Sequence, residues 1–77
     1  MDNANANEVK VTPPAEHEEP ILRFFKWEHL PSRLAGVSQP FGLLADIIVR
    51  DLPRSAERTV ALRKLLESKD AAVRAAL

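Results

Sequence analysis

The chain has 77 residues, and its 11 basic and 11 acidic side chains give a formal net charge of zero. This length fits one small domain, and no apolar run approaches the roughly 20 residues that span a bilayer. With no cysteine and only two histidines, the sequence excludes disulfides and thiolate metal sites and argues against a histidine metal cluster.

The charge is distributed unevenly along the chain. Residues 1–20 hold five acids and one base, whereas residues 21–77 hold ten bases and six acids. Residues 1–19 contain almost no large apolar side chain, so we expect a disordered acidic tail. This asparagine-rich start is unlike a signal peptide, and it favours a bacterial cytoplasm as the location, without a membrane partner.

An aromatic arm and a short helical turn are expected over residues 20–37. Phe24, Phe25 and Trp27 fall in a segment that is either extended or irregular. A single helical turn is expected to begin at Pro31 and to end at Gly36, because proline is favoured at helix starts and glycine at helix ends.

Residues 38–77 read as a helical hairpin. Ser38 is the expected N-cap of a first helix over about residues 39–51, with Pro40 tolerated in its first turn. Leu52-Pro53-Arg54 is too short for anything but an antiparallel return, and Ser55 caps a second helix that runs to about residue 76. The predicted fold is all-α, an antiparallel helical hairpin with an N-terminal turn and arm.

The first helix carries more apolar surface than a hairpin can cover. At about 100° per residue, its large apolar side chains span roughly 240° of the circumference. A core this small, without a disulfide or metal, also needs further support. We therefore expect a homo-oligomer, with a subunit of a larger hetero-complex as the alternative.

Two basic residues break the pattern of the second helix. Arg58 and Lys69 project from the apolar arc, which is formed by Ala61, Leu62, Leu65, Leu66, Ala72, Val73 and Ala76. Arg58 lies in the first turn, where the helix dipole favours anions, so a bound anion would stabilise it there.

The second helix therefore opens on a candidate anion site. Arg54, Ser55, Arg58 and Thr59, together with free helix N–H groups, are its expected components. The alternative for Arg58 is that its stem packs while the guanidinium extends to solvent. The alternative for Lys69 is a solvated charge at the rim of the hairpin.

Trp27 and Lys26 are the candidate ligand platform in the arm. A cation beside a flat aromatic side chain suits a stacked base and its phosphate. The alternative for Trp27 is a plug in the core or at an interface. Phe24, Phe25 and Phe41 are assigned to the core.

Because the chain offers no nucleophile elbow, glycine-rich phosphate loop or positioned acid and base, it is not expected to be an enzyme or to hold a cofactor.

These features resemble a known family. The stretch 57–75, with Ala61-Leu62 and Lys64-Leu65, is similar to the signature helix of phage sponges that sequester immune cyclic nucleotides, the anti-CBASS and anti-Thoeris hairpin proteins. Leu44-Ala45 and the Leu52-Pro53 turn resemble the preceding helix. The resemblance covers about residues 24–75. The sequence also resembles small proteins of actinobacterial phages.

The resemblance implies a function that the residue pattern alone does not give. Such proteins form compact homo-oligomers, commonly hexamers, and bind cyclic di- or trinucleotides such as cyclic GMP-AMP between protomers without hydrolysing them. They thereby block CBASS-type antiviral signalling in the host cytoplasm. Here Glu57-Arg58 resembles the opening of the family helix, and Phe25-Lys26-Trp27 resembles its base-stacking arm. Many members of the family carry a Trp-Ala-Asn step in the second helix, and Ala71-Ala72-Val73 take its place here.

Two other functions compete with this expectation. A nucleic-acid-binding regulator is compatible with the basic body, but the second helix alternates acids and bases and presents no continuous basic stripe for duplex nucleic acid. A protein-interaction or assembly module would instead use the apolar first helix, and it would become ordered only with its partner.

Overall fold

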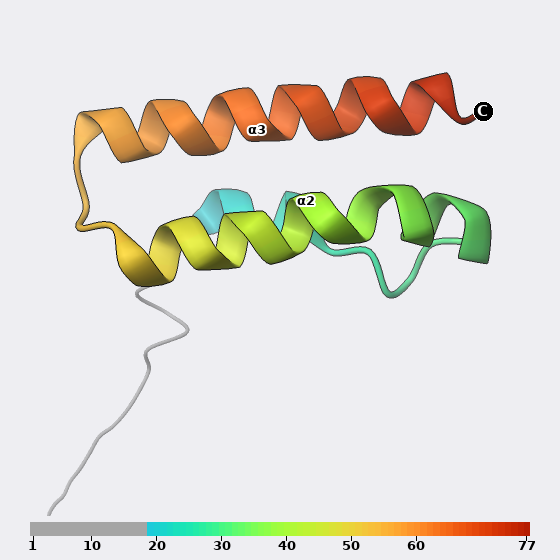
Figure 1. Cartoon of the computed structure of the whole chain (residues 1–77), viewed down its shortest axis with the longest axis horizontal. Coiled ribbons are helices and arrows are strands. Elements are labelled where there is room, and N and C mark those ends of the chain that lie inside the picture. Colours follow the sequence, from blue (N-terminus) through green and yellow to red (C-terminus); the bar gives the residue numbers. More distant parts are fainter. Residues whose placement is uncertain (1–18) are drawn as a thin grey trace, which may run out of the picture.

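The computed structural model describes residues 19–77, which form three helical elements and no strand. A 3₁₀ helix, η3, spans Pro20–Phe25, and two α-helices follow, α2 over Ser32–Asp51 and α3 over Ala56–Ala75. Helices α2 and α3 run antiparallel side by side (Figure 1). The predicted all-α hairpin is confirmed, whereas the predicted tail lies, except for Glu19, outside the described residues.

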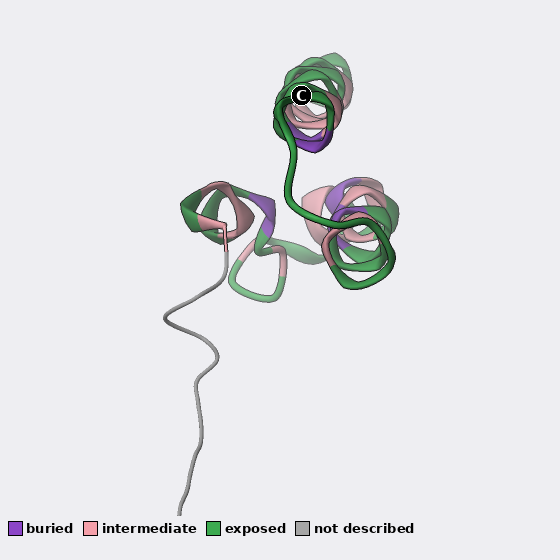
Figure 2. Cartoon of the chain, turned by 90° about the vertical axis from the view of Figure 1, so that its left-hand side faces the viewer, coloured by how far each residue is buried: buried purple, intermediate pink, exposed green. Residues whose placement is uncertain are grey.

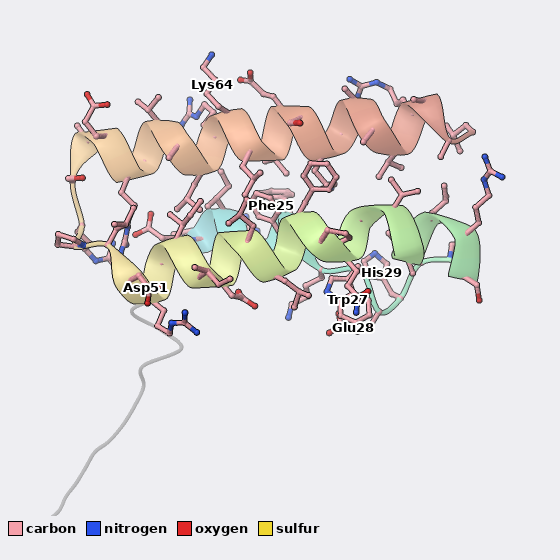
Figure 3. All side chains as sticks on the ribbon, in the orientation of Figure 1. Phe25, Trp27, Glu28, His29, Asp51 and Lys64 are labelled. Carbon is pink, nitrogen blue, oxygen red and sulfur yellow. The ribbon has the colours of Figure 1, made fainter. Side chains whose placement is uncertain are left out.

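A small core lies where the three elements meet. Phe25 of η3, Ala45 of α2 and Leu62 of α3 are buried, and half-buried aliphatic and aromatic side chains surround them. Viewed from the end, the three elements form a triangle whose buried faces point inward (Figure 2). Phe25 points between the two long helices, whereas Lys64 points away from α3 into solvent (Figure 3).

Helix α2 begins earlier than the sequence pattern predicted. It starts at Ser32 after Pro31 and continues through Pro40, so the expected separate turn and the N-cap at Ser38 are both wrong. Proline at position 40 removes one hydrogen bond and crowds the carbonyl four residues earlier, that of Gly36. Gly36 is exposed, and beyond its own helix no atom lies within 4 Å of the place that a Cβ would take.

The end of α2 and the connector follow the prediction. Leu52 adopts an extended conformation (φ −113°, ψ 138°), as expected for the residue that precedes a proline. Helix α3 then begins at its predicted cap, because the Ser55 Oγ accepts a hydrogen bond of 3.0 Å from the backbone N–H of Arg58.

The outer face of α2 has no partner among residues 19–77. Leu43, Leu44 and Ile47 are 49%, 45% and 42% exposed, so the hairpin does leave apolar surface uncovered. Self-association through it stays a prediction. Neither long helix of the described chain is long and apolar enough to cross a membrane.

Candidate functional site

The seven predicted ligand-binding residues do not form one site. Arg54, Ser55, Arg58 and Thr59 lie at the hairpin tip, where α2 turns into α3. Lys69 lies eleven residues beyond Arg58, which is about 16 Å along a helix axis. It lines a hollow that Lys26 of the arm also lines. The structure therefore separates a tip cluster from a groove beside the arm.

At the hairpin tip, Arg58 binds groups of the protein itself. Its side chain is 6% exposed, and Nη1 donates to the backbone oxygens of Leu52 at 2.8 Å and Val49 at 3.2 Å. Nη2 donates to Oε2 of Glu19 at 2.7 Å. An anion does meet Arg58, as its position in the first turn indicated, but it is a carboxylate of the same chain.

The other tip residues are also engaged. The Thr59 hydroxyl donates to the backbone oxygen of Ser55 at 3.2 Å, and the Ser55 hydroxyl caps the helix. Arg54 donates to the same Glu19 oxygen as Arg58 does. Capture of a ligand phosphate at this cluster stays a prediction, and such a phosphate would have to share or replace Glu19.

Glu19 is the tip residue that sequence reasoning missed. Its carboxylate is 12% exposed and contacts two arginines more than 30 residues later in the chain. In the sequence, only its charge indicated this role, because an acidic residue directly before the arm could compensate the positive charge of Arg58. Nothing local in the sequence brings the two together.

The second location is a groove of about 350 Å³ between the arm and the C-terminal half of α3. Its lining consists of Arg23, Phe24, Lys26, His29, Leu30, Lys69, Asp70, Val73 and Arg74. Four of these side chains are basic and one is acidic, which gives a formal charge of plus three with histidine neutral. A concave surface of this sign attracts anions.

Lys69 is the most enclosed cation of the groove. It projects from the apolar side of α3, its side chain is only 13% exposed, and its Nζ lies 2.9 Å from Oδ1 of the neighbouring Asp70. Water screens a charge poorly in such a position, so an anion that reached Lys69 would interact with it more strongly than with an exposed lysine. The helical pattern singled out this residue correctly as an exception.

Phe24 provides an exposed ring at the same groove. It is 53% exposed, which corrects the prediction that it belongs to the core, and the guanidinium carbon of Arg23 lies 5.2 Å from the centre of its ring. Phe25, the next residue, takes the core position instead. A flat ring beside a cation can stack a planar ligand group while the cation meets a phosphate.

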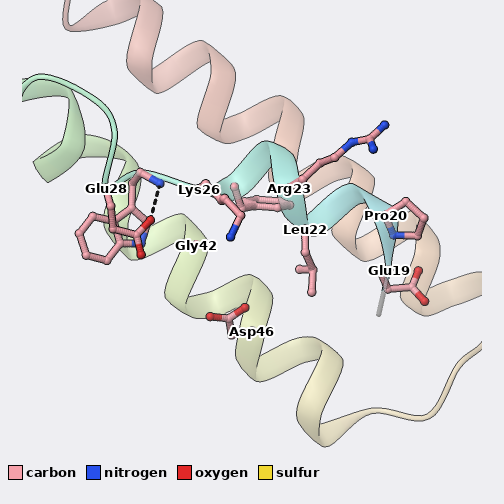
Figure 4. Close-up of a pocket in the computed structure, with 10 residues that line it drawn as sticks. Glu19, Pro20, Leu22, Arg23, Lys26, Glu28, Gly42 and Asp46 are labelled. Carbon is pink, nitrogen blue, oxygen red and sulfur yellow. Dashed lines mark hydrogen bonds between the residues drawn. The ribbon is translucent and has the colours of Figure 1, made fainter. Parts of the chain in front are cut away.

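Trp27 lies at a different hollow. This cavity, of about 310 Å³, is formed by the arm, the turn after it and α2 (Figure 4). The indole packs on the backbone of α2, since a Cβ on Gly42 would come within 2.9 Å of its Cδ1. The hollow is lined by three acids, Glu19, Glu28 and Asp46, and two bases, so it favours anions less than the groove does.

Glu28 stabilises the turn beside this hollow. Its carboxylate accepts hydrogen bonds from its own backbone N–H and from that of Trp27, and these lower its pKa below the ordinary value. At the far end of α2, a hydrogen bond from Arg50 likewise lowers the pKa of Asp51.

In the described part of the chain, no group of three or more histidine and acidic side chains is placed to hold a metal ion.

Comparisons of the chain with family models, with curated proteins and with solved structures gave no match.

Proposed function

We propose that this protein binds cyclic oligonucleotides, namely cyclic di- or trinucleotides, and sequesters them without cleavage. The observation that carries the proposal is the groove between the arm and α3, where four basic side chains and an exposed phenyl ring line one concave surface. The resemblance of the second helix and the Leu-Pro turn to phage cyclic-nucleotide sponges supports it as well.

The chemistry of the ligand fits this surface. A cyclic oligonucleotide carries two or three phosphates in a fixed ring together with flat bases, so it needs cations and aromatic faces at fixed separations. Lys69 and Arg23 would meet phosphate oxygens, and Phe24 would stack on a base. A preorganised ligand on a preformed groove loses little conformational freedom, which favours tight binding.

The biological setting is part of the proposal. In a phage-infected bacterium, the protein would remain in the host cytoplasm and deplete the second messenger of CBASS-type defence. We also propose that it acts as a homo-oligomer, a hexamer in keeping with the family that it resembles. The exposed apolar face of α2, with Leu43, Leu44 and Ile47, supports self-association because a copy of the same helix would remove it from water.

Calorimetric titration of the full chain with a panel of cyclic di- and trinucleotides tests the proposal. The ligand is then recovered by denaturation and chromatographed. Binding with intact ligand recovered supports sequestration, whereas recovery of a linear product would make the protein a hydrolase. A stable oligomer that gives no heat with any member of the panel contradicts the proposal.

A second function is favoured by the same apolar face. Exposed leucine and isoleucine side chains on α2 would also suit an assembly module whose partner is another protein. Sedimentation of the purified chain separates the two, because a sponge should be an oligomer alone whereas a module should be a monomer until its partner is added. A steep salt dependence of binding to duplex DNA would instead indicate a nucleic-acid-binding regulator.

A further inference from the structure

We infer that Glu19 is a positioning residue that holds the arm in the orientation needed by the groove, an inference that rests on the proposed function. Glu19 is not among the residues that line the groove. It precedes η3 directly, and its carboxylate binds Arg58 at the hairpin tip, about 16 Å along α3 from Lys69. Its effect on binding would therefore act through the arm.

The groove has two walls that belong to different elements. Arg23, Phe24 and Lys26 come from the arm, whereas Lys69 and Arg74 come from α3. The spacing of cations across the groove therefore depends on how the arm lies against the hairpin. A ligand with phosphates at fixed separations is sensitive to that spacing.

The arm is held by a buried aromatic side chain at one end and by an ion pair at the other, and Ile21 and Leu22 between them also pack against the core. Phe25, 3% exposed, inserts between the helices, and Glu19 binds Arg58 and Arg54 at the hairpin tip. Between these anchors, the backbone N–H of Leu22 donates to the backbone oxygen of Glu19 at 3.0 Å. The apolar side chains seat η3 against the long helices, and the Glu19 ion pairs add a directional attachment at its N-terminal end.

Arg58 is a firm attachment for this purpose. Its guanidinium is already held by the carbonyl oxygens of Val49, in the last turn of α2, and of Leu52, the residue that caps α2, while its backbone lies in the first turn of α3. The bond to Glu19 therefore ties the arm to both long helices at once. Arg23 lies between the two anchors in sequence, so it should depend on Glu19 more than Lys69 does.

The test compares Glu19→Gln with Glu67→Gln, which removes the same charge from an exposed site on α3. Affinity for cyclic GMP-AMP is measured by calorimetry on the full chain. Because each substitution removes one negative charge, this change alone would make either variant bind the anionic ligand slightly more tightly. We expect Glu19→Gln to bind about tenfold more weakly instead, within the usual range of couplings between separate sites, and Glu67→Gln to bind no more weakly than the unmodified protein.

A double-mutant cycle identifies the route of the effect. The loss of binding free energy in the double variant Glu19→Gln with Arg23→Gln should be smaller than the sum of the losses in the two single variants. For Glu19→Gln with Lys69→Gln, the two losses should add. Additivity in both pairs, or an affinity of Glu19→Gln equal to or above that of the unmodified protein, would overturn the positioning role and leave the proposed function standing.

Hydrogen exchange tests the anchoring of the arm by Glu19 separately from the binding of cyclic nucleotides. In Glu19→Gln, the amide of Leu22 should exchange faster while the central amides of α2 and α3 keep their protection. If the unmodified protein binds no cyclic nucleotide, the proposed function fails, and the exchange rate of Leu22 alone decides whether Glu19 holds the arm. Unchanged exchange there would refute the anchor itself.

Discussion

Replacing Arg58 by alanine should destabilise the protein far more than replacing any exposed arginine. The Arg58 guanidinium is buried and donates to the backbone oxygens of Val49 and Leu52 and to the Glu19 carboxylate. Truncation would leave those carbonyl groups without their donor at the hairpin tip, and it would also remove the packing of the side-chain stem.

The expected loss can be bounded from these contacts. Breaking a fully buried ion pair costs about 3–5 kcal/mol, because the remaining charge is stranded. Here the stranded carboxylate of Glu19 keeps its bond to Arg54, which is well exposed, so the penalty is smaller. We expect a loss of about 2–4 kcal/mol, which corresponds to a fall in Tm of roughly 8 °C or more in so small a domain.

Thermal and urea unfolding followed by circular dichroism measure this loss. The matched control is Arg63→Ala on the exposed face of the same helix, which should change stability by no more than about 0.5 kcal/mol. Arg58→Lys should fall between the two, because one ammonium cannot serve three acceptors in the fork geometry of a guanidinium. Equal stability of Arg58→Ala and the control would refute the assignment of Arg58 as the link at the tip.

Further predictions concern Gly42, Gly36, Ser38 and Glu28. Gly42→Ala should destabilise by about 1–3 kcal/mol because the new methyl group would come within 2.8 Å of the backbone oxygen of Phe25 and 2.9 Å of the Trp27 ring. Gly36→Ala places its methyl group in open space, so it should stabilise by about 0.5–1 kcal/mol in the same unfolding assay. Ser38→Ala should raise stability by about 1 kcal/mol, since the buried Ser38 hydroxyl has no partner among the described residues; a lower Tm would contradict this. Because the pKa of Glu28 is lowered, its stabilising bond to the turn should be present at a pH above the ordinary pKa of glutamate and lost as the pH falls through the lower folded-state pKa. A fluorescence titration of Trp27 should show that acid transition, and Glu28→Gln should abolish it.

Features set by neighbouring residues could be predicted from the sequence. Ser55 as a cap, Leu52-Pro53 as a stop and the apolar arc of α3 each depend on interactions within one helical turn. Arg58 and Lys69 were recognised as exceptions because a charged residue on an apolar arc is visible in the periodicity alone.

The start of α2 could not be predicted in this way. Gly36, Ser38 and Pro40 each favour a break in the helix locally, yet the helix continues through all three. Packing decides the outcome, because Ser38 and Gly42 on one face are buried, and Trp27 lies close against Gly42. Tertiary contacts of this kind outweigh local preferences of about 1 kcal/mol or less for glycine and serine and about 3 kcal/mol for proline.

The site was predicted only in part for a similar reason. Helical periodicity identifies Lys69, but the arm has no strong period, so nothing distinguished Phe24 at the groove from Phe25 in the core. The pairing of Glu19 with Arg58 spans 39 positions, and a long-range ion pair leaves no spacing signal in a single sequence.

The most direct test of the account is a calorimetric comparison of Lys69→Gln and Arg63→Gln with the unmodified protein, using cyclic GMP-AMP as ligand. Both substitutions remove one positive charge from α3, but only Lys69 lines the groove. Loss of one charge-assisted contact, about 1.5–3 kcal/mol, should weaken binding by Lys69→Gln roughly 10- to 100-fold and leave Arg63→Gln nearly unchanged. Equal affinities of the two variants would show that the groove is not the nucleotide site.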